Sequence, residues 1–335
     1  MGLPAGLPRR LLLAGLAASG VSPGAAEPRR FRIALANLDE TPGMTLEGLG
    51  FTGAELRRSF ELAARTMPVD MLWFDNAGDP ARAIANAEAA IVAQADLLIE
   101  YNADTDANAE IARRLTAAGI PALALVDKLP GAPLYGPDNR AAGSIAGRAL
   151  GAFAQQNWPG EQVRGVLIGD LADPSPAIGE RVQGINEGVR QSLPTLQFAS
   201  LDTGGESVRA DALLTKFLRT ERGRLLIATL DDLAAVYAKN AIEMTRRQSD
   251  CIIVSQGLDR NIHGGASEKK ELDPNNRGSV VLGSVAYYMD RYGYDVLPLA
   301  MRMLAGETLP AHTVTRHVLV TAANVFREYP PFDMN

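Results

Sequence analysis

Hydrophobic runs alternate with longer amphipathic stretches along the chain, and the whole pattern occurs twice. Apolar runs at 31–37 and 163–169 open the two copies, and each is followed by a polar loop and a segment with helical spacing of its apolar residues. Each copy then has a second strand, a second helix and a third strand that ends in polar residues, at 96–104 and 224–232. Strands that alternate with helices are typical of parallel sheets built from βαβ units. The pattern therefore predicts an α/β fold of two Rossmann-like lobes, with a cleft at the carboxyl ends of the strands.

Local signals place several of the helices. Asp79 and Pro80 form a helix start, because Asp can cap a helix and Pro fits its first position. Asp138 is expected to cap a helix in which Gly143 and Gly147 lie four residues apart on one face. We expect this helix to pack unusually close to its neighbour, because glycine has no side chain.

The C-terminal part of the sequence belongs to neither copy alone. It holds a polar loop at 260–278, a strand near 280–285, a helix from about 296 to 304 and a final strand near 314–321. A chain that returns to the first lobe and then to the second would join them by a multi-strand hinge. The expected boundaries are 27–136 plus 288–311 for lobe 1 and 137–287 plus 312–335 for lobe 2.

The first 26 residues differ in composition from the rest. Arg9 and Arg10 precede an apolar run that ends at Val21, and small residues follow at 24–26. This order is typical of a secretory signal peptide, here with cleavage near Ala26, and the run is too short for a permanent membrane span. The paired arginines also fit the twin-arginine export pattern. We therefore expect an exported soluble protein, with the export route left open.

The composition excludes several classes of function. Of 335 residues, 47% are hydrophobic and 21% are charged, as in ordinary soluble domains. The net charge of -6 and the absence of a long basic run disfavour nucleic acid as a partner. Cys251 is the sole cysteine and lies in an apolar run, so it is expected to be a buried core residue.

Familiar reactive motifs are missing from the places where they would act. There is no GxxxxGK[ST] loop; the GxGxxG match, GLGFTG at 48–53, lies well beyond the end of the first strand at 37, and the GxSxG match, GVSPG at 20–24, lies in the expected signal peptide. His263, His312 and His317 show no metal-ligand spacing. We therefore expect no cofactor, no metal site and no enzymatic activity.

Polar and aromatic residues gather instead where predicted strands end or helices begin. Carboxylates with Arg or Lys can hold sugar hydroxyls by charge-assisted hydrogen bonds, and an aromatic ring can cover the apolar face of a sugar. For any single residue, a helix cap or a turn is an equally good interpretation. The candidate ligand-binding residues are Asp39, Phe51, Asn102, Asp127, Lys128, Arg181, Asp231 and Asp259.

Seven segments in order carry a family resemblance. They are GIPALALVDK (119–128), GPDNRAAGSIAGRALG (136–151), GERVQGINEG (179–188), IATLDDLAAVYAKNAI (227–242), GLD (257–259), GSVAYYMDRYGYDVLPLAMRMLAGETLP (283–310) and HVLVTAANV (317–325). The chain resembles the periplasmic sugar-binding proteins of ABC importers, the ribose-binding-like branch with the type I periplasmic binding protein fold. Regulators of the lactose-repressor type share this fold, but here a signal peptide stands where their DNA-binding helices would be.

The resemblance assigns roles to particular residues. Asp127 and Lys128 match an Asp-Arg pair that holds sugar hydroxyls, with Lys in place of Arg and without its bidentate fork. Arg181 matches the ligand arginine of an RxxG helix start, and Asp259 matches the aspartate that ends the later strand. Asp231 also fits the pattern.

Three departures separate this sequence from ribose binders. Leu230 stands where a ligand asparagine is usual. Tyr287 stands where a glutamine is usual, near an expected hinge crossing, and is the ninth candidate ligand-binding residue. The loop at 38–50 is long and lacks paired aromatic residues, which leaves Phe51 to stack on a sugar. Ribose itself is therefore disfavoured as the ligand.

The resemblance implies a monomeric periplasmic protein that captures a small polyhydroxylated ligand, a monosaccharide or polyol, and closes around it by a hinge. The closed form would deliver the ligand to a membrane ABC permease. Three alternatives stay open at this point. They are a sensor that presents its closed form to a chemoreceptor or sensor kinase, an exported enzyme, and a binder of a non-sugar ligand such as a nucleoside.

Overall fold

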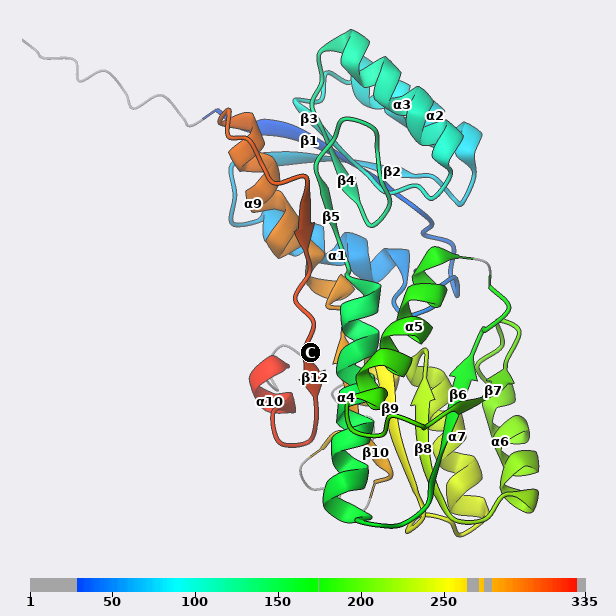
Figure 1. The fold of residues 1–335 in the computed structure, drawn as a ribbon. Coiled ribbons are helices and arrows are strands. Elements are labelled where there is room, and N and C mark those ends of the chain that lie inside the picture. Colours follow the sequence, from blue (N-terminus) through cyan, green and yellow to red (C-terminus); the bar gives the residue numbers. More distant parts are fainter. Residues whose placement is uncertain (1–28, 174, 264–270, 274–278, 330–335) are drawn as a thin grey trace, which may run out of the picture.

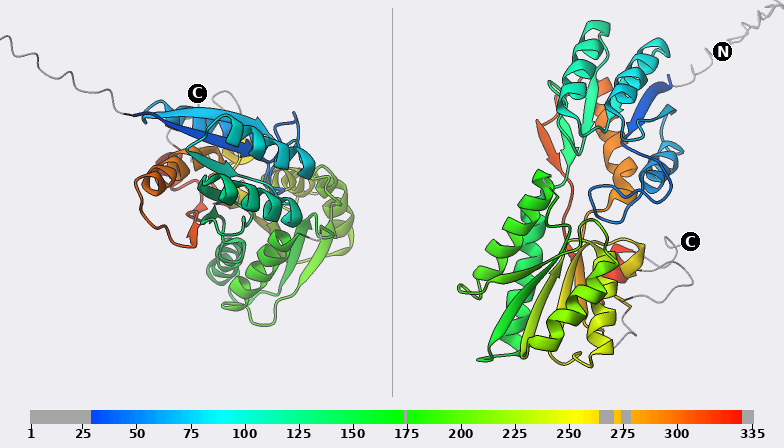
Figure 2. Two further views of the ribbon diagram at one scale, coloured as in Figure 1. Left: turned by 90° about the horizontal axis from the view of Figure 1, so that it is seen from above. Right: turned by 90° about the vertical axis from the view of Figure 1, so that its right-hand side faces the viewer.

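The computed structural model describes residues 29–329 except 174, 264–270 and 274–278. It has two α/β lobes, each built on a six-stranded sheet, and the two lobes lie one above the other (Figures 1 and 2). This confirms the predicted fold class. The expected signal peptide at 1–26 lies outside the described residues, as does part of the predicted loop at 260–278. Within the described part of the chain, no helix is long and apolar enough to cross a membrane.

The first sheet is parallel throughout, with strand order β11-β5-β4-β3-β1-β2. Helices α2 and α3 contact each other on one side of it, and α1 and α9 do so on the other (Figure 1). The strands are β1 (Phe31–Asn37), β2 (Val69–Asp75), β3 (Leu97–Glu100), β4 (Ala122–Leu125), β5 (Leu134–Gly136) and β11 (His312–Val314). The helices are α1 (Gly53–Ala64), α2 (Pro80–Val92), α3 (Thr105–Ala118) and α9 (Tyr292–Leu304), which follows the short 3₁₀ helix η1 (Met289–Arg291).

The second sheet has the order β12-β10-β9-β8-β6-β7 and is parallel except for the β10–β12 pair. Successive residues of the strand 224–229 alternate between its two faces: Leu226 and Ala228 lie on the face toward α4 and α5, and Leu225 and Ile227 lie on the face toward α6 and α7. All four are apolar because both faces of the sheet are buried. The strands are β6 (Val163–Gly169), β7 (Phe198–Asp202), β8 (Arg224–Thr229), β9 (Cys251–Gly257), β10 (Val281–Ala286) and β12 (Leu319–Val320). The helices are α4 (Asn139–Asn157), α5 (Pro176–Arg190), α6 (Arg209–Thr220), α7 (Asp232–Met244), α8 (Arg260–His263) and α10 (Val325–Glu328).

Three described segments join the lobes. They run from β5 to α4, from β10 to α9 and from β11 to β12. The third segment differs from the sequence-based boundary, because residues 312–314 pair with β5 of the first sheet instead of starting lobe 2. The predicted strand at 314–321 is accordingly two short strands, one in each sheet, with the crossing between them.

The predicted helix starts are confirmed. Asp79 Oδ1 accepts from the backbone N–H of Ala81 at 2.8 Å, with Pro80 at the first helical position. Asp138 Oδ1 accepts from the backbone N–H of Ala141, also at 2.8 Å. These caps satisfy N–H groups that a helix leaves without an internal partner.

The cysteine and the two tryptophans lie in the hydrophobic core or pack against it. Cys251 is buried as predicted, and burial raises the pKa of its thiol to about 12. Trp73 packs partly buried against the core, with the Arg57 guanidinium over its ring. Trp158 is the C-cap residue of α4; its ring is buried and meets Phe153 edge to face.

Helices α4 and α5 touch backbone to backbone, as the glycine spacing predicts. A Cβ added at Gly147 would lie 2.1 Å from the carbonyl oxygen of Ile185, and one at Gly143 would lie 2.2 Å from that of Arg181. Gly184 and Gly188 of α5 present the same bare surface to α4. The seam between the helices is therefore made by glycines on both sides.

We expect Gly147→Ala to lower the free energy of unfolding by about 1–3 kcal/mol, because the backbone of α5 must move to admit the new methyl group. Urea denaturation followed by circular dichroism measures this change. Gly179→Ala in α5 is the matched control, since a Cβ there meets nothing within 4 Å. The control should be neutral or stabilising by up to about 1 kcal/mol. Equal stability of both variants would contradict close packing at the seam.

Candidate ligand-binding site between the lobes

Arg181 links the two lobes. It lies in the second turn of α5 and its side chain is fully buried. Its Nη1 donates to the backbone oxygen of Glu47 in lobe 1 at 3.0 Å, and its Nε donates to Asn139 Oδ1 at 2.8 Å. Nη2 lies 4.0 Å from Glu47 Oε2 and has no hydrogen-bond partner among the described residues. One guanidinium thus meets a lobe-1 loop, α4 and a carboxylate.

The loop between β1 and α1 reaches from lobe 1 onto the end of β9. A Cβ added at Gly50 would lie 1.6 Å from Asp259 Oδ2, and one at Gly257 would lie 2.7 Å from the carbonyl oxygen of Leu49. Gly50 has a φ of +86°, a conformation that L side chains rarely adopt. The loop therefore approaches Asp259 more closely than any other residue type at position 50 would allow.

Asp259 is buried and only half satisfied. Its Oδ1 accepts from the backbone N–H of Asn261 at 2.7 Å, while Oδ2 has no partner among the described residues. Burial, together with the nearby charge of Asp232, raises the pKa of Asp259 well above its usual range. Asp232 is saturated by comparison: it accepts from the hydroxyls of Ser255 and Ser284 and from the backbone N–H of Asp259.

Asp231 and Tyr287 complete the lobe-2 side. Asp231 Oδ1 accepts from the backbone N–H of Ala234 at 2.7 Å, so it caps α7, and burial raises its pKa. Tyr287 follows β10 at a crossing between the lobes. Its hydroxyl lies 2.9 Å from Gln256 Oε1, and the Arg181 guanidinium lies over its ring at 5.1 Å. Burial raises the pKa of Tyr287 to about 12.

On the lobe-1 side, Glu47 and Asp127 form a pair of acidic side chains. The hydroxyl of Tyr101 donates to Glu47 Oε1 at 3.1 Å. Asp127 Oδ2 is buried and has no partner among the described residues. Burial, followed by the charge of Glu47, raises the pKa of Asp127 to about 7. Lys128, the next residue, is exposed.

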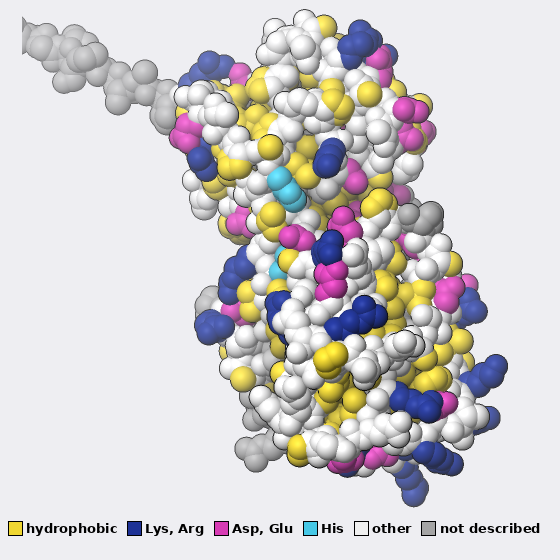
Figure 3. All heavy atoms as spheres, in the orientation of Figure 1, with side chains coloured by type: hydrophobic (Ala, Val, Ile, Leu, Met, Phe, Trp, Pro, Cys, Tyr) yellow, Lys and Arg dark blue, Asp and Glu magenta, His cyan; other side chains and the backbone are white. Residues whose placement is uncertain are grey.

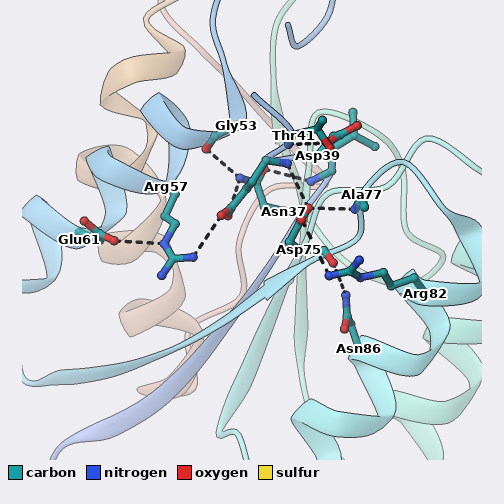
Figure 4. A network of polar contacts seen from close by, with 12 residues as sticks. Asn37, Asp39, Thr41, Gly53, Arg57, Glu61, Asp75, Ala77, Arg82 and Asn86 are labelled. Atoms are coloured by element: carbon teal, nitrogen blue, oxygen red, sulfur yellow. Dashed lines mark hydrogen bonds and ion pairs between the residues drawn. The ribbon is translucent and has the colours of Figure 1, made fainter. Parts of the chain in front are cut away.

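Three of the remaining candidates, Asn102, Phe51 and Asp39, have structural contacts within lobe 1. Asn102 and Asn108 exchange hydrogen bonds and tie the end of β3 to α3. Phe51 is buried in the hydrophobic core beneath the loop. Asp39 accepts from the backbone N–H of Thr41 at 2.7 Å, within a polar network at the ends of β1 and β2 that also includes Asp75 (Figure 4).

The structure thus brings together five of the nine predicted residues: Asp127, Arg181, Asp231, Asp259 and Tyr287. Ligand binding by any of the nine stays a prediction. Sequence reasoning missed Glu47, Tyr101 and Asn139, since Glu47 lies in a loop without periodicity. Asn139 had one available signal, its position directly after the capping Asp138. No cluster of metal-ligating side chains is present among the residues that the structure describes.

Acidic and basic side chains lie side by side where the two lobes meet, on the face shown in Figure 3. The cluster between the lobes differs from this mixed surface. Arg181 lies 4.0 Å from Glu47 and its charge acts on Asp231, while Glu47 acts on Asp127 and Asp231 acts on Asp259. Such a site can accept hydrogen bonds from several hydroxyl or ammonium groups and donate a few in return.

Comparison with known proteins places this arrangement in a family. A family model described as "Periplasmic binding protein domain" matches residues 50–308. No curated protein matches the chain in sequence.

Solved structures share the fold at low sequence identity. A solute-binding protein of an ABC transporter from Actinobacillus succinogenes, with bound D-allose, is 15% identical with a TM-score of 0.68, and the match covers 90% of this chain and 100% of that one. A sugar-binding protein of a sugar ABC transporter from Bacillus halodurans is 18% identical with a TM-score of 0.68, at the same coverage. A solute-binding protein from Mycobacterium smegmatis, with bound glycerol, is 14% identical with a TM-score of 0.66, covering 89% and 96%.

The raised pKa of Asp127 leads to a pH-dependent stability. The pKa rises from its usual 3.8 to about 7 on folding, so the folded state binds the proton more tightly. The Asp127 contribution to stability is therefore complete below about pH 4 and is lost as the pH rises to about 7. We expect the free energy of unfolding of Asp127→Asn, measured by urea denaturation, to increase relative to that of the native chain by more than about 1 kcal/mol as the pH rises from 5 to 8.

Asp70→Asn is the control for this measurement. Asp70 is a half-exposed carboxylate in a surface ion pair with Arg30. Its removal should leave the difference from the native chain constant over the same pH range, because exposed pairs contribute little. If the free energy of unfolding of Asp127→Asn also differed from that of the native chain by the same amount at every pH, the pKa of Asp127 would not be raised by folding.

Proposed function

This chain belongs to the periplasmic binding protein domain family, and we propose that it captures a monosaccharide or polyol between its lobes and delivers it to a membrane ABC permease. We infer that it is exported by the signal at 1–26 and works as a periplasmic monomer without covalent chemistry. The D-allose and glycerol bound by its structural neighbours support a polyhydroxylated ligand. A sensor role is not favoured by these comparisons.

The proposal rests on buried polar atoms of both lobes that could form further hydrogen bonds. Arg181 Nη2, Asp127 Oδ2 and Asp259 Oδ2 are buried and have no partner among the described residues. A buried polar group without a partner costs roughly 1–3 kcal/mol. Hydroxyl groups both donate and accept, so a polyol in the cleft satisfies the guanidinium and the carboxylates together.

The same geometry explains why binding would close the lobes. The unpartnered groups come from both lobes: Asp127 from lobe 1, Arg181 and Asp259 from lobe 2. A ligand that bonds to both sides binds the closed form more tightly than an open one, and so shifts the population toward closure. The three crossings between the sheets are the elements that would change conformation.

A thermal-shift screen of the purified chain against sugars, polyols, nucleosides and amino acids tests the proposed ligand class. A ligand that binds only the folded state raises the melting temperature by mass action. We expect a rise with sugars or polyols. A rise with nucleosides or amino acids alone would contradict the proposed class.

Arg181→Ala should weaken binding of the strongest ligand in this screen by about 30-fold or more, equivalent to about 2 kcal/mol, because it removes a buried charged donor. Isothermal titration calorimetry measures the change. Arg190→Ala, an exposed arginine at the end of the same helix, is the control and should bind normally. Arg181→Lys keeps the charge without the fork and should bind with an intermediate affinity if Arg181→Ala folds poorly. Native affinity in both Arg181 variants would remove this residue from the site.

A further inference from the structure

The acidic side chains between the lobes outnumber the cations that could neutralise them. Glu47 and Asp127 come from lobe 1, and Asp231 and Asp259 come from lobe 2. Arg181 is fully buried, lies within ion-pair distance of Glu47 alone and acts through its charge on Asp231. No ion pair of the described part of the chain includes Asp127 or Asp259. The cluster thus holds four carboxyl groups and one buried guanidinium.

The hydrogen bonds of Arg181 go to neutral acceptors rather than to carboxylates. Its Nε and Nη1 donate to neutral oxygens, the side-chain amide of Asn139 and the backbone carbonyl of Glu47. The remaining Nη2 points toward Glu47 Oε2 at 4.0 Å and has no hydrogen-bond partner among the described residues. This fully buried donor without a partner lies beside an acidic side chain, which favours this place for a ligand group.

The other polar groups around the cluster are neutral or acidic. The hydroxyl of Tyr101 donates to Glu47, and burial lowers the pKa of His317, so its ring adds no positive charge at neutral pH. Asp138, whose charge acts on Tyr287 and His317, is a further acid beside the site. Burial and the Glu47 charge raise the pKa of Asp127. A positive charge on the ligand would relieve this repulsion, whereas a neutral hydroxyl would not.

We propose that the pair Glu47 and Asp127 binds a protonated amino group, so that the site selects a hydroxylated amine such as an amino sugar or amino polyol over its neutral parent. This rests on the proposed function and names the ligand class of the same site. The ligand hydroxyls would bond to Arg181 and Asp259, while the ammonium group would donate to the two lobe-1 carboxylates. A charge-assisted bond to a carboxylate is roughly twice as strong as a neutral one. Glu47 is thereby the residue that determines specificity.

Calorimetry with matched pairs of probes tests the proposal at pH 7. The pairs are glycerol with 2-amino-1,3-propanediol, D-glucose with D-glucosamine, and D-galactose with D-galactosamine; D-glucuronate is the anionic probe. For at least one pair the amine should bind at least about 10-fold more tightly than its parent, and D-glucuronate should bind most weakly of the glucose series. A parent that binds as tightly as its amine in every pair would overturn the inference while leaving the proposed function intact. Failure of every sugar and polyol to bind would overturn both.

Isosteric variants assign the preference to its residues. Glu47→Gln and Asp127→Asn should each reduce the ratio of the two affinities, amine over neutral parent, to about 3-fold or less. Glu307→Gln removes a half-exposed carboxylate of a surface ion pair with Arg302 and should keep the full preference. If both cleft variants also keep the full preference, the amine is recognised elsewhere and the assignment to Glu47 and Asp127 is wrong.

Discussion

A guanidinium that is completely removed from water between two lobes needs a partner for each of its donors, and the region around Arg181 is organised by this requirement. Asn139 at the start of α4 and the backbone of Glu47 in the first lobe each satisfy one part of it. Tyr287 provides an aromatic face at the same place. Three separate stretches of the chain are thereby held in register by one side chain. Of its three nitrogens, Nη2 alone has no hydrogen-bond partner among the described residues.

The carboxylates near Arg181 show why the lobes meet at this end of their sheets. In parallel sheets the carboxyl ends of all strands point to one edge, so the loops that follow them gather there. Asp127 follows β4 and Asp259 follows β9, in different lobes, yet each has one buried oxygen without a partner among the described residues. Burying such groups destabilises the protein unless something bonds to them, and this cost is acceptable where a ligand is to be held. Asp232, beside them, is fully bonded and holds the loop after β9 in place.

The fold could be predicted because it depends on local patterns. Strands buried on both faces need continuous apolar runs, and capping residues such as Asp79 and Asp138 mark helix starts directly in the sequence. The site could be predicted only in part, because it depends on long-range contacts. Glu47 has no local signal, since Arg181 and Tyr101, distant in sequence, define its position. Adjacent residues such as Asp127 and Lys128 received the same role from the resemblance but differ in burial, since neighbouring side chains at a strand end point in different directions.

The glycine seam between α4 and α5 bears on the order in which the site assembles. Because the two backbones touch, there is no layer of side chains between them that could repack when the lobes separate. Asn139 and Arg181, one on each of these helices, therefore keep their mutual geometry in an open form of the protein. Under the proposed function this part of the site would be preorganised, and its ordering entropy would not have to be lost when the ligand binds. The ligand would contact these two helices of the second lobe first, and the first lobe would then close over it.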